Sequence, residues 1–128
     1  MNKKQLFSGI TAALLFASVL VEASNVPSKS EFKNTSKEID AIIQKSCYGC
    51  HNSESKNDKA KDKLDFKTFE SLSKPDKIHA LREIGDVLKD DDMPPKKFLE
   101  RFPDKALTKD EKKALMDWAK KEAKEAMK

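Results

Sequence analysis

Apolar residues recur at helical spacing in three parts of the chain, and these parts predict three helices. The first set, Ile39, Ile42 and Ile43, follows the i, i+3, i+4 pattern of an amphipathic helix. Ser36 stands just before this set and is a favourable N-cap residue. The predicted helix leads directly into Cys47, so this cysteine marks its C-terminal end.

A second helix is predicted from Ser73 to Lys89. Ser73 is a favourable N-cap, Pro75 is tolerated in a first turn, and Asp76 suits the positive end of the helix dipole. The apolar stripe of this helix has four members: Ile78, Leu81, Ile84 and Leu88.

The third predicted helix opens with a capping box, formed by Thr108 and Glu111, and runs to near the C-terminus. Its inner face carries Leu107, Leu115, Trp118 and Ala119. The sequence has no alternating run of β-branched residues and no hairpin turn signal. It therefore predicts an all-α fold, a small bundle of three to four helices with long loops.

The segments between these helices are predicted as loops. Residues 52–63 are polar and charged and show no periodic signal. Residues 90–95 contain two adjacent prolines, which exclude a helix and favour an extended segment. Residues 96–106 form a further loop with three apolar side chains, Phe98, Leu99 and Phe102. A short apolar patch, of one helical turn, follows the first loop: Leu64, Phe66 and Phe69.

The first 23 residues predict a secretory signal peptide. Lys3 and Lys4 precede an apolar stretch over residues 6–21, and Ala23 closes a cleavage site with small residues at both recognised positions. A retained membrane anchor is the alternative, but the apolar run is short for a span and no basic stop-transfer cluster follows it. We expect cleavage near Ala23, a periplasmic or otherwise exported location, and no membrane span in the mature chain.

Residues 24–35 then predict a flexible leader and residues 36–128 a single domain. Charged residues make up 38% of the chain, aromatic residues 7%, and the formal net charge is +4. The charges alternate in sign without a basic stripe, so we expect no nucleic-acid binding. A core with so few large apolar groups is marginal at this length, and we expect a metal, a disulfide or a buried cofactor to help hold the fold.

Both cysteines and one of the two histidines lie in a single stretch, Cys47-Tyr-Gly-Cys50-His51. A disulfide across two intervening residues closes a very small loop and would stabilise the fold little. A thioredoxin-like dithiol needs a βαβ context with the motif at a helix N-terminus, whereas this motif follows a helix. A structural zinc ion needs four ligands, and the chain offers only these three and the distant His79.

The remaining hypothesis is covalent attachment of haem. In a C-x-x-C-H motif each thiol adds to a haem vinyl group, and the adjacent histidine becomes the proximal iron ligand. We therefore predict one haem c attached through Cys47 and Cys50 with His51 on the iron, while the dithiol and zinc hypotheses stay open. Eight residues are expected to pack around the haem: Ile42, Ile43, Leu81, Ile84, Leu88, Phe98, Leu115 and Trp118.

Met93 is the predicted sixth ligand of the iron. It is the sole apolar residue between three aspartates and two prolines, and the prolines would hold it rigidly across the haem face. There are two alternatives: His79 is the sixth ligand, or the sixth position of the iron is open. Met116 and Met127 lie within the last predicted helix, where a methionine is ordinarily a core or surface residue. A His/Met pair raises the reduction potential relative to two histidines.

Together these features resemble a small monohaem c-type cytochrome. More narrowly, the chain is similar to the bacterial haem-binding domain family, in which CxxCH precedes a Met-Pro segment and a final L-x-x-x-E-x-x-x-L-x-x-W helix. Here the final helix reads from Leu107 through Glu111 and Leu115 to Trp118. The resemblance spans residues 36–121 and implies a cytochrome c-like fold around one haem. The polar run at 52–63 departs from the aromatic and proline-rich packing expected there.

The sequence therefore predicts an exported monohaem c-type cytochrome that carries single electrons. It has no Ser/His/Asp set, paired carboxylates or Gly-rich phosphate loop, so we expect no enzymatic activity. The alternative is a haem-based sensor or ligand-binding module in which Met93 dissociates. Lys96 and Lys97 could form a docking rim for an acidic redox partner, and we expect a monomer.

Overall fold

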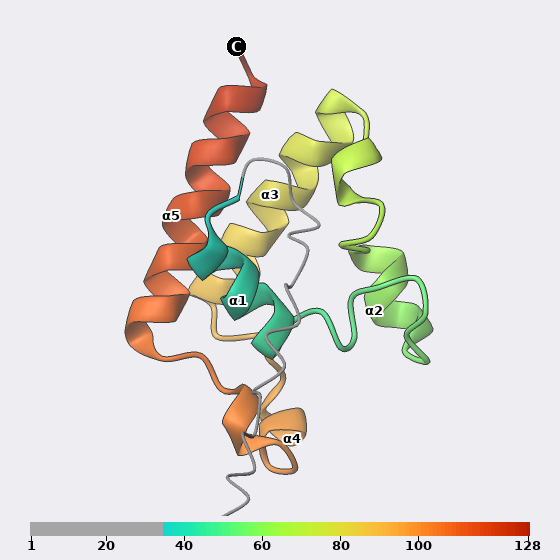
Figure 1. Ribbon diagram of the computed structural model, residues 1–128, viewed down its shortest axis with the longest axis vertical. Coiled ribbons are helices and arrows are strands. Elements are labelled where there is room, and N and C mark those ends of the chain that lie inside the picture. Colours follow the sequence, from blue (N-terminus) through green and yellow to red (C-terminus); the bar gives the residue numbers. More distant parts are fainter. Residues whose placement is uncertain (1–34) are drawn as a thin grey trace, which may run out of the picture.

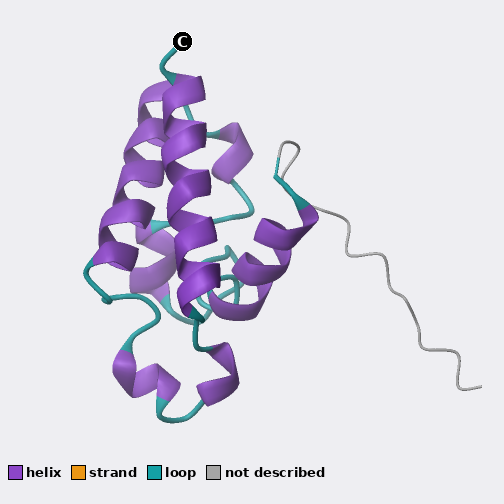
Figure 2. Cartoon of the chain, turned by 90° about the vertical axis from the view of Figure 1, so that its left-hand side faces the viewer, coloured by secondary structure: helices purple, strands orange, loops and turns teal. Residues whose placement is uncertain are grey.

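The structure is a computed structural model that describes residues 35–128. Within this range the chain forms five α-helices, two short 3-10 helices and no strand, which confirms the predicted all-α fold (Figure 1, Figure 2). The predicted signal peptide, and all but the last residue of the predicted leader, lie outside the described residues. The helices are α1 (Lys37–Ser46), α2 (Asp58–Lys63), η1 (Phe69–Ser71), α3 (Lys74–Lys89), α4 (Lys96–Leu99), η2 (Pro103–Lys105) and α5 (Lys109–Ala126).

The three predicted helices correspond to α1, α3 and α5, and each begins at the expected cap. Ser36 and Ser73 each accept a hydrogen bond from the backbone N–H three residues further on. Thr108 and Glu111 form the predicted capping box, with Thr108 N–H donating to the Glu111 carboxylate at 2.8 Å. These local contacts satisfy N–H groups that a helix start otherwise leaves without partners.

The core lies where these three helices meet. α3 and α5 run side by side, and α1 packs against α5 (Figure 1). Of the predicted apolar stripes, only Ile78 and Leu107 are half-buried rather than buried. Phe66 and Phe69, from the predicted apolar patch, also enter the core. The buried apolar residues are Ile39, Ile42, Ile43, Phe66, Phe69, Leu81, Ile84, Leu88, Leu115, Trp118, Ala119 and Ala123.

Two segments that we expected to be loops contain short helices. α2 forms six residues of the polar run 52–63, and α4 forms four residues directly after Pro95. α2 begins at Asn57, whose side-chain oxygen accepts a hydrogen bond from the Ala60 N–H at 3.2 Å. Both helices are too short to show an apolar repeat, so the periodicity that reveals the longer helices gives no signal here.

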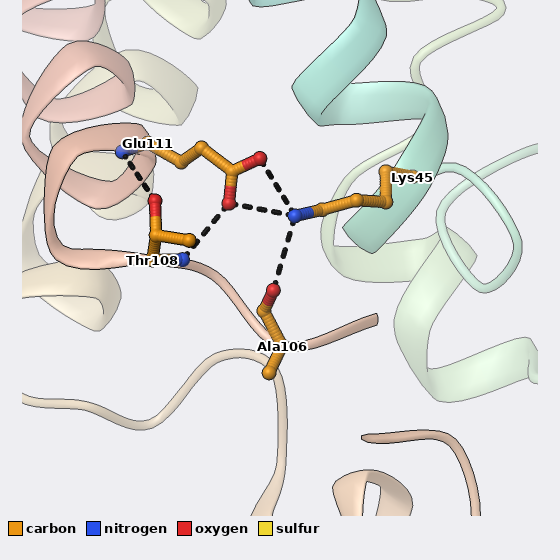
Figure 3. A network of polar contacts seen from close by, with 4 residues as sticks. All are labelled: Lys45, Ala106, Thr108 and Glu111. Atoms are coloured by element: carbon orange, nitrogen blue, oxygen red, sulfur yellow. Dashed lines mark hydrogen bonds and ion pairs between the residues drawn. The ribbon is translucent and has the colours of Figure 1, made fainter. Parts of the chain in front are cut away.

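One lysine ties α1 to α5. Lys45, in the last turn of α1, donates hydrogen bonds to both carboxylate oxygens of Glu111 at 2.7 and 2.6 Å and to the Ala106 carbonyl at 3.1 Å (Figure 3). The same carboxylate completes the capping box with Thr108. Hydrogen bonds from Lys45 and from the Thr108 N–H hold the pKa of Glu111 below its ordinary value. The C-terminal end of α1 is therefore fixed against the first turn of α5.

Candidate functional site

The CYGCH stretch continues the last turn of α1 as a tight turn. The Cys47 N–H donates to the Ile43 carbonyl at 2.9 Å, which makes Cys47 the C-cap of the helix. The N–H groups of Cys50 and His51 both donate to the Cys47 carbonyl at 3.1 Å. This turn brings Cys47, Cys50 and His51 to the wall of one small cavity.

Two backbone carbonyls at the end of α2 hold the imidazole of His51. Its Nδ1 lies 2.9 Å from the Ala60 oxygen and 3.1 Å from the Leu64 oxygen. Carbonyl oxygens only accept hydrogen bonds, so Nδ1 must carry the proton. In the neutral ring this leaves the Nε2 lone pair to bind a metal, and the hydrogen bonds fix the orientation of the ring, as outer partners of metal-bound histidines do.

The loop after His51 is also held in place. The Phe66 N–H donates to the His51 carbonyl at 3.0 Å, and the Phe66 ring meets the imidazole edge to face, with centroids 6.4 Å apart. Asn52 is buried, and its amide donates to the Tyr48 carbonyl and accepts from the Glu54 N–H. The polar run 52–63, which we expected to be a solvated loop, therefore contributes to the support of the histidine.

Nothing in the described residues supports a redox dithiol or a zinc site at the two thiols. They are not joined in a disulfide. Burial, together with the neighbouring Cys50, raises the pKa of the Cys47 thiol to about 12, whereas reactive cysteines have lowered values. Within residues 35–128, no group of three His, Cys, Asp or Glu side chains is arranged to hold a metal ion.

The end of α3 determines where Met93 lies. The Asp92 N–H donates to the Val87 carbonyl and the Asp91 N–H to the Leu88 carbonyl, the two bonds of a Schellman motif. Asp91 has a φ of 58°, in the left-handed region that aspartate tolerates better than most residues. Lys112 of α5 pairs with its carboxylate. Part of the aspartate run therefore forms the turn that leads the chain into Met93.

Met93 and His51 lie on the walls of the same two cavities. One cavity has a volume of about 570 Å³ and the other about 130 Å³. Four residues line both of them: Cys47, His51, Leu88 and Met93. The structure thus brings Met93 close to Cys47 and His51, although Met93 is far from them in the sequence. Cys50 lines the small cavity but not the large one.

The other candidate ligands are placed differently. Of the three described methionines, only Met93 lines these cavities. Met116 packs against the core, and the exposed Met127 accepts a hydrogen bond on its sulfur from Arg82. His79 is exposed and lies on the wall of the large cavity only. Met93 is therefore the described methionine that shares its surroundings with His51.

The large cavity is big enough to hold a small-molecule cofactor. Its volume falls in the range of small-molecule sites, about 300–1,000 Å³. Of the eight residues expected around the haem, Ile43, Ile84, Leu88, Leu115 and Trp118 line this cavity. Phe98 lines the small cavity with Leu88. Ile42 and Leu81 line neither cavity and are buried in the core.

The fold and the site define an all-α haem-binding protein. A family model described as a haem-binding domain matches residues 56–121, which is more than half of the chain. The chain belongs to this family, as its resemblance in sequence indicated. The matched range runs from α2 into α5 and includes Met93, whereas the CYGCH stretch lies just before it. No curated protein and no solved structure matches the chain.

Proposed function

We propose that the protein is an exported monohaem c-type cytochrome that carries single electrons. Cys47 and Cys50 would hold the haem through thioether bonds, and His51 and Met93 would bind its iron. The observation that carries this proposal is that His51 and Met93 line the same two cavities beside Cys47. When bound, haem supplies the one-electron couple of its iron.

Attachment needs only what the two cysteines provide. Cys47 and Cys50 would hold the haem by adding their S–H groups across its two vinyl double bonds, which would give two carbon–sulfur bonds with each hydrogen on the other vinyl carbon. No oxidant or reductant is consumed. The turn that follows α1 holds Cys50 close to Cys47, with the Cys50 N–H bonded to the Cys47 carbonyl.

The protein groups around the iron are suited to electron transfer. The carbonyls of Ala60 and Leu64 hold the His51 ring and increase the basicity of Nε2. The thioether of Met93 is a soft ligand that favours the ferrous state, so the pair sets a higher potential than two imidazoles would. Two protein ligands would keep the coordination the same in both oxidation states, and the buried Leu88, Leu115 and Trp118 form part of the wall around them.

The surroundings of Met93 support a role in docking. Lys96 and Lys97 are exposed and begin α4, two residues beyond the Met93-Pro94 bond. An acidic surface on a redox partner would be attracted to this basic rim, mainly through faster association. We propose that the carrier meets such partners as a monomer.

The N-terminal sequence supports export of this cytochrome. Residues 1–23 carry the basic, apolar and small-residue segments of a signal peptide, although they lie outside the described residues. None of the helices in the described part of the chain is long and apolar enough to cross a membrane.

Replacement of Met93 tests the axial assignment. Met93→Ala in the ferric protein should abolish the weak sulfur-to-iron charge-transfer band at the red end of the spectrum. The ferrous variant should bind carbon monoxide, because its sixth position is open. Met116→Ala is the matched control, since Met116 packs against the core away from both cavities, and its spectrum should stay unchanged.

Two results would contradict the proposal. Ready binding of carbon monoxide by the unmutated ferrous protein would favour a haem sensor with a labile sixth ligand. Loss of the low-spin signal in His79→Ala, with Met93→Ala unaffected, would assign the sixth position to His79.

A further inference from the structure

The carbonyl oxygen of Ala60 accepts two hydrogen bonds at the end of α2. One comes from the Leu64 N–H at 3.0 Å and closes the last turn of this helix, and the other comes from Nδ1 of His51 at 2.9 Å. The Leu64 carbonyl lies 3.1 Å from the same nitrogen. One imidazole N–H group thus faces two acceptors, and the Ala60 oxygen is the nearer. The strength of the hydrogen bond from His51 therefore depends on where α2 places Ala60.

The two acceptors are held in place by different contacts. Leu64 packs against the hydrophobic core, and two residues further on the buried Phe66 donates its N–H to the His51 carbonyl at 3.0 Å. α2 lies at one edge of the molecule, and none of its residues is buried (Figure 1). The Leu64 carbonyl is therefore fixed by the core, whereas the Ala60 carbonyl is fixed chiefly by the hydrogen bonds of α2.

Asn57 provides two of these hydrogen bonds. Its side-chain oxygen accepts from the Ala60 N–H at 3.2 Å, and its backbone carbonyl accepts from the Lys61 N–H at 3.1 Å. The Lys61 N–H belongs to the same planar peptide group as the Ala60 oxygen, so the second bond acts on the acceptor itself. A helix of six residues is unstable in water without such support. The cap at Asn57 therefore stabilises the turn that presents the Ala60 oxygen to His51.

We propose that Asn57 is a positioning residue that lowers the reduction potential of the haem iron by acting through α2 and His51. A hydrogen bond at Nδ1 increases the electron donation of Nε2 to a bound metal, and stronger donation favours ferric iron. By holding the Ala60 acceptor in place, Asn57 opposes the effect of the Met93 thioether. This inference rests on the proposed function, because it requires haem iron on His51.

A direct effect of Asn57 on the cofactor has to be separated from this indirect one. Asn57 is exposed and uncharged, so its replacement leaves the charge of the protein unchanged. It also lines the small cavity together with His51 and Met93. The test therefore needs two replacements that change the wall of this cavity in the same way but differ in their ability to cap a helix.

Asn57→Ala and Asn57→Ser meet this requirement. Both shorten the side chain at the cavity wall, but only serine keeps an oxygen that can cap α2. In a spectroelectrochemical titration of the holoprotein, Asn57→Ala should raise the reduction potential, and Asn57→Ser should leave it close to that of the unmutated protein. Both variants should keep the low-spin His/Met spectrum, because the Leu64 carbonyl still orients the His51 ring.

Hydrogen exchange measures the contact itself. In the ¹H–¹⁵N spectrum of the ferrous holoprotein, the Nδ1 proton of His51 should exchange about five times faster in Asn57→Ala, because the loss of a typical cap makes local opening of α2 that much more frequent. Exchange in Asn57→Ser should be close to that of the unmutated protein.

Ser73→Ala is the matched control for a general loss of stability. Ser73 caps α3 by accepting a hydrogen bond from the Asp76 N–H at 3.3 Å, but α3 supplies neither of the carbonyls that hold His51. This variant should have a lower Tm, with the potential and the exchange of the Nδ1 proton unchanged.

Three results would overturn the inference. Equal shifts of potential in Asn57→Ala and Asn57→Ser would mean that the side chain acts directly at the cavity. An unchanged potential in Asn57→Ala would mean that the Ala60 contact does not influence the iron. An equal rise in Ser73→Ala would assign the effect to reduced overall stability.

Failure of the proposed function looks different from these results. It would appear in the unmutated protein, as a preparation that binds no haem or that lacks the His/Met spectrum. Because α2 contributes no buried residue, Asn57→Ala should keep the fold, and far-UV circular dichroism checks this directly.

Discussion

Replacing Lys45 by methionine should loosen the join between α1 and α5. Methionine has a similar length and apolar stem but cannot donate the hydrogen bonds to Glu111 and to the Ala106 carbonyl (Figure 3). The side chains of Lys45 and Glu111 are 31% and 26% exposed, so the pair is partly screened by solvent. The loss should therefore be moderate.

The magnitude follows from the two interactions that are removed. A partly exposed ion pair contributes about 0.5–1 kcal/mol, and the hydrogen bond to the Ala106 carbonyl contributes about 1 kcal/mol. The free energy of unfolding should fall by about 1.5–2 kcal/mol. In a domain of this size each kcal/mol shifts the melting temperature by roughly 4–8 °C, so we expect Tm to fall by roughly 6–16 °C.

Thermal unfolding followed by far-UV circular dichroism measures this change in the holoprotein. Lys113→Met is the matched control, because Lys113 pairs with Asp117 at the surface, and its Tm should barely change. A double-mutant cycle with Glu111→Gln, which can keep the capping contact, should give a coupling energy of about 1 kcal/mol. Equal Tm losses for Lys45→Met and Lys113→Met, or a coupling energy near zero, would refute the reasoning.

The pH dependence gives an independent check. The pKa of Glu111 in the folded protein is below its ordinary value of 4.5, chiefly because of the hydrogen bond from Lys45. The stability that Glu111 contributes is therefore fully present above its pKa in the unfolded chain and is lost as the pH falls through its pKa in the folded protein. The Tm difference between the unmutated protein and Lys45→Met should shrink over that acidic range. A difference that is constant from neutral to acidic pH would contradict this linkage.

Three further predictions concern the haem and the core. Haem should remain with the polypeptide through denaturation and acid–acetone extraction, and replacement of both Cys47 and Cys50 by alanine should release it; complete extraction from the unmutated protein would exclude thioether bonds. The haem-free chain should be largely unfolded by circular dichroism, because the cofactor fills much of a small core, and a cooperative melt of this chain would show that the core suffices without haem. Leu115→Ala should cost about 2–5 kcal/mol in urea unfolding of the holoprotein, because Leu115 is 2% exposed and its truncation leaves a cavity; a loss below 1 kcal/mol would mean that the surroundings collapse onto it.

The long helices could be predicted because their signals are local. The caps at Ser36, Ser73 and Thr108 each act within three residues of the helix start. The apolar stripes of α1, α3 and α5 report which face will be buried before any partner is known. Most of the core followed from these stripes.

The support of His51 could not be predicted in the same way. α2 is only six residues long, and an isolated helix of this length is unstable in water. Its ends are stabilised by Asn57 and by the hydrogen bonds between His51 and the carbonyls of Ala60 and Leu64. The second of these contacts exists only in the folded chain. In the sequence, the one local sign of α2 is Asn57 followed by residues that favour a helix.

Met93 is an intermediate case. The adjacent prolines and aspartates singled it out in the sequence, but its position beside His51 depends on the turn at Asp91 and on the packing of α3. Lys45 and Glu111 are 66 positions apart and carry no sequence signal of their pairing, because each is one of many charged residues.

The join between α1 and α5 has a consequence for the order in which the molecule is built. A ribosome makes the chain from its N-terminus, so the CYGCH stretch exists before α5 does. Until Glu111 and the rest of α5 have been added, Lys45 lacks the carboxylate that it binds and α1 lacks its contacts with α5. The two cysteines are therefore already present while the C-terminal end of α1 still lacks the contacts that fix it against α5.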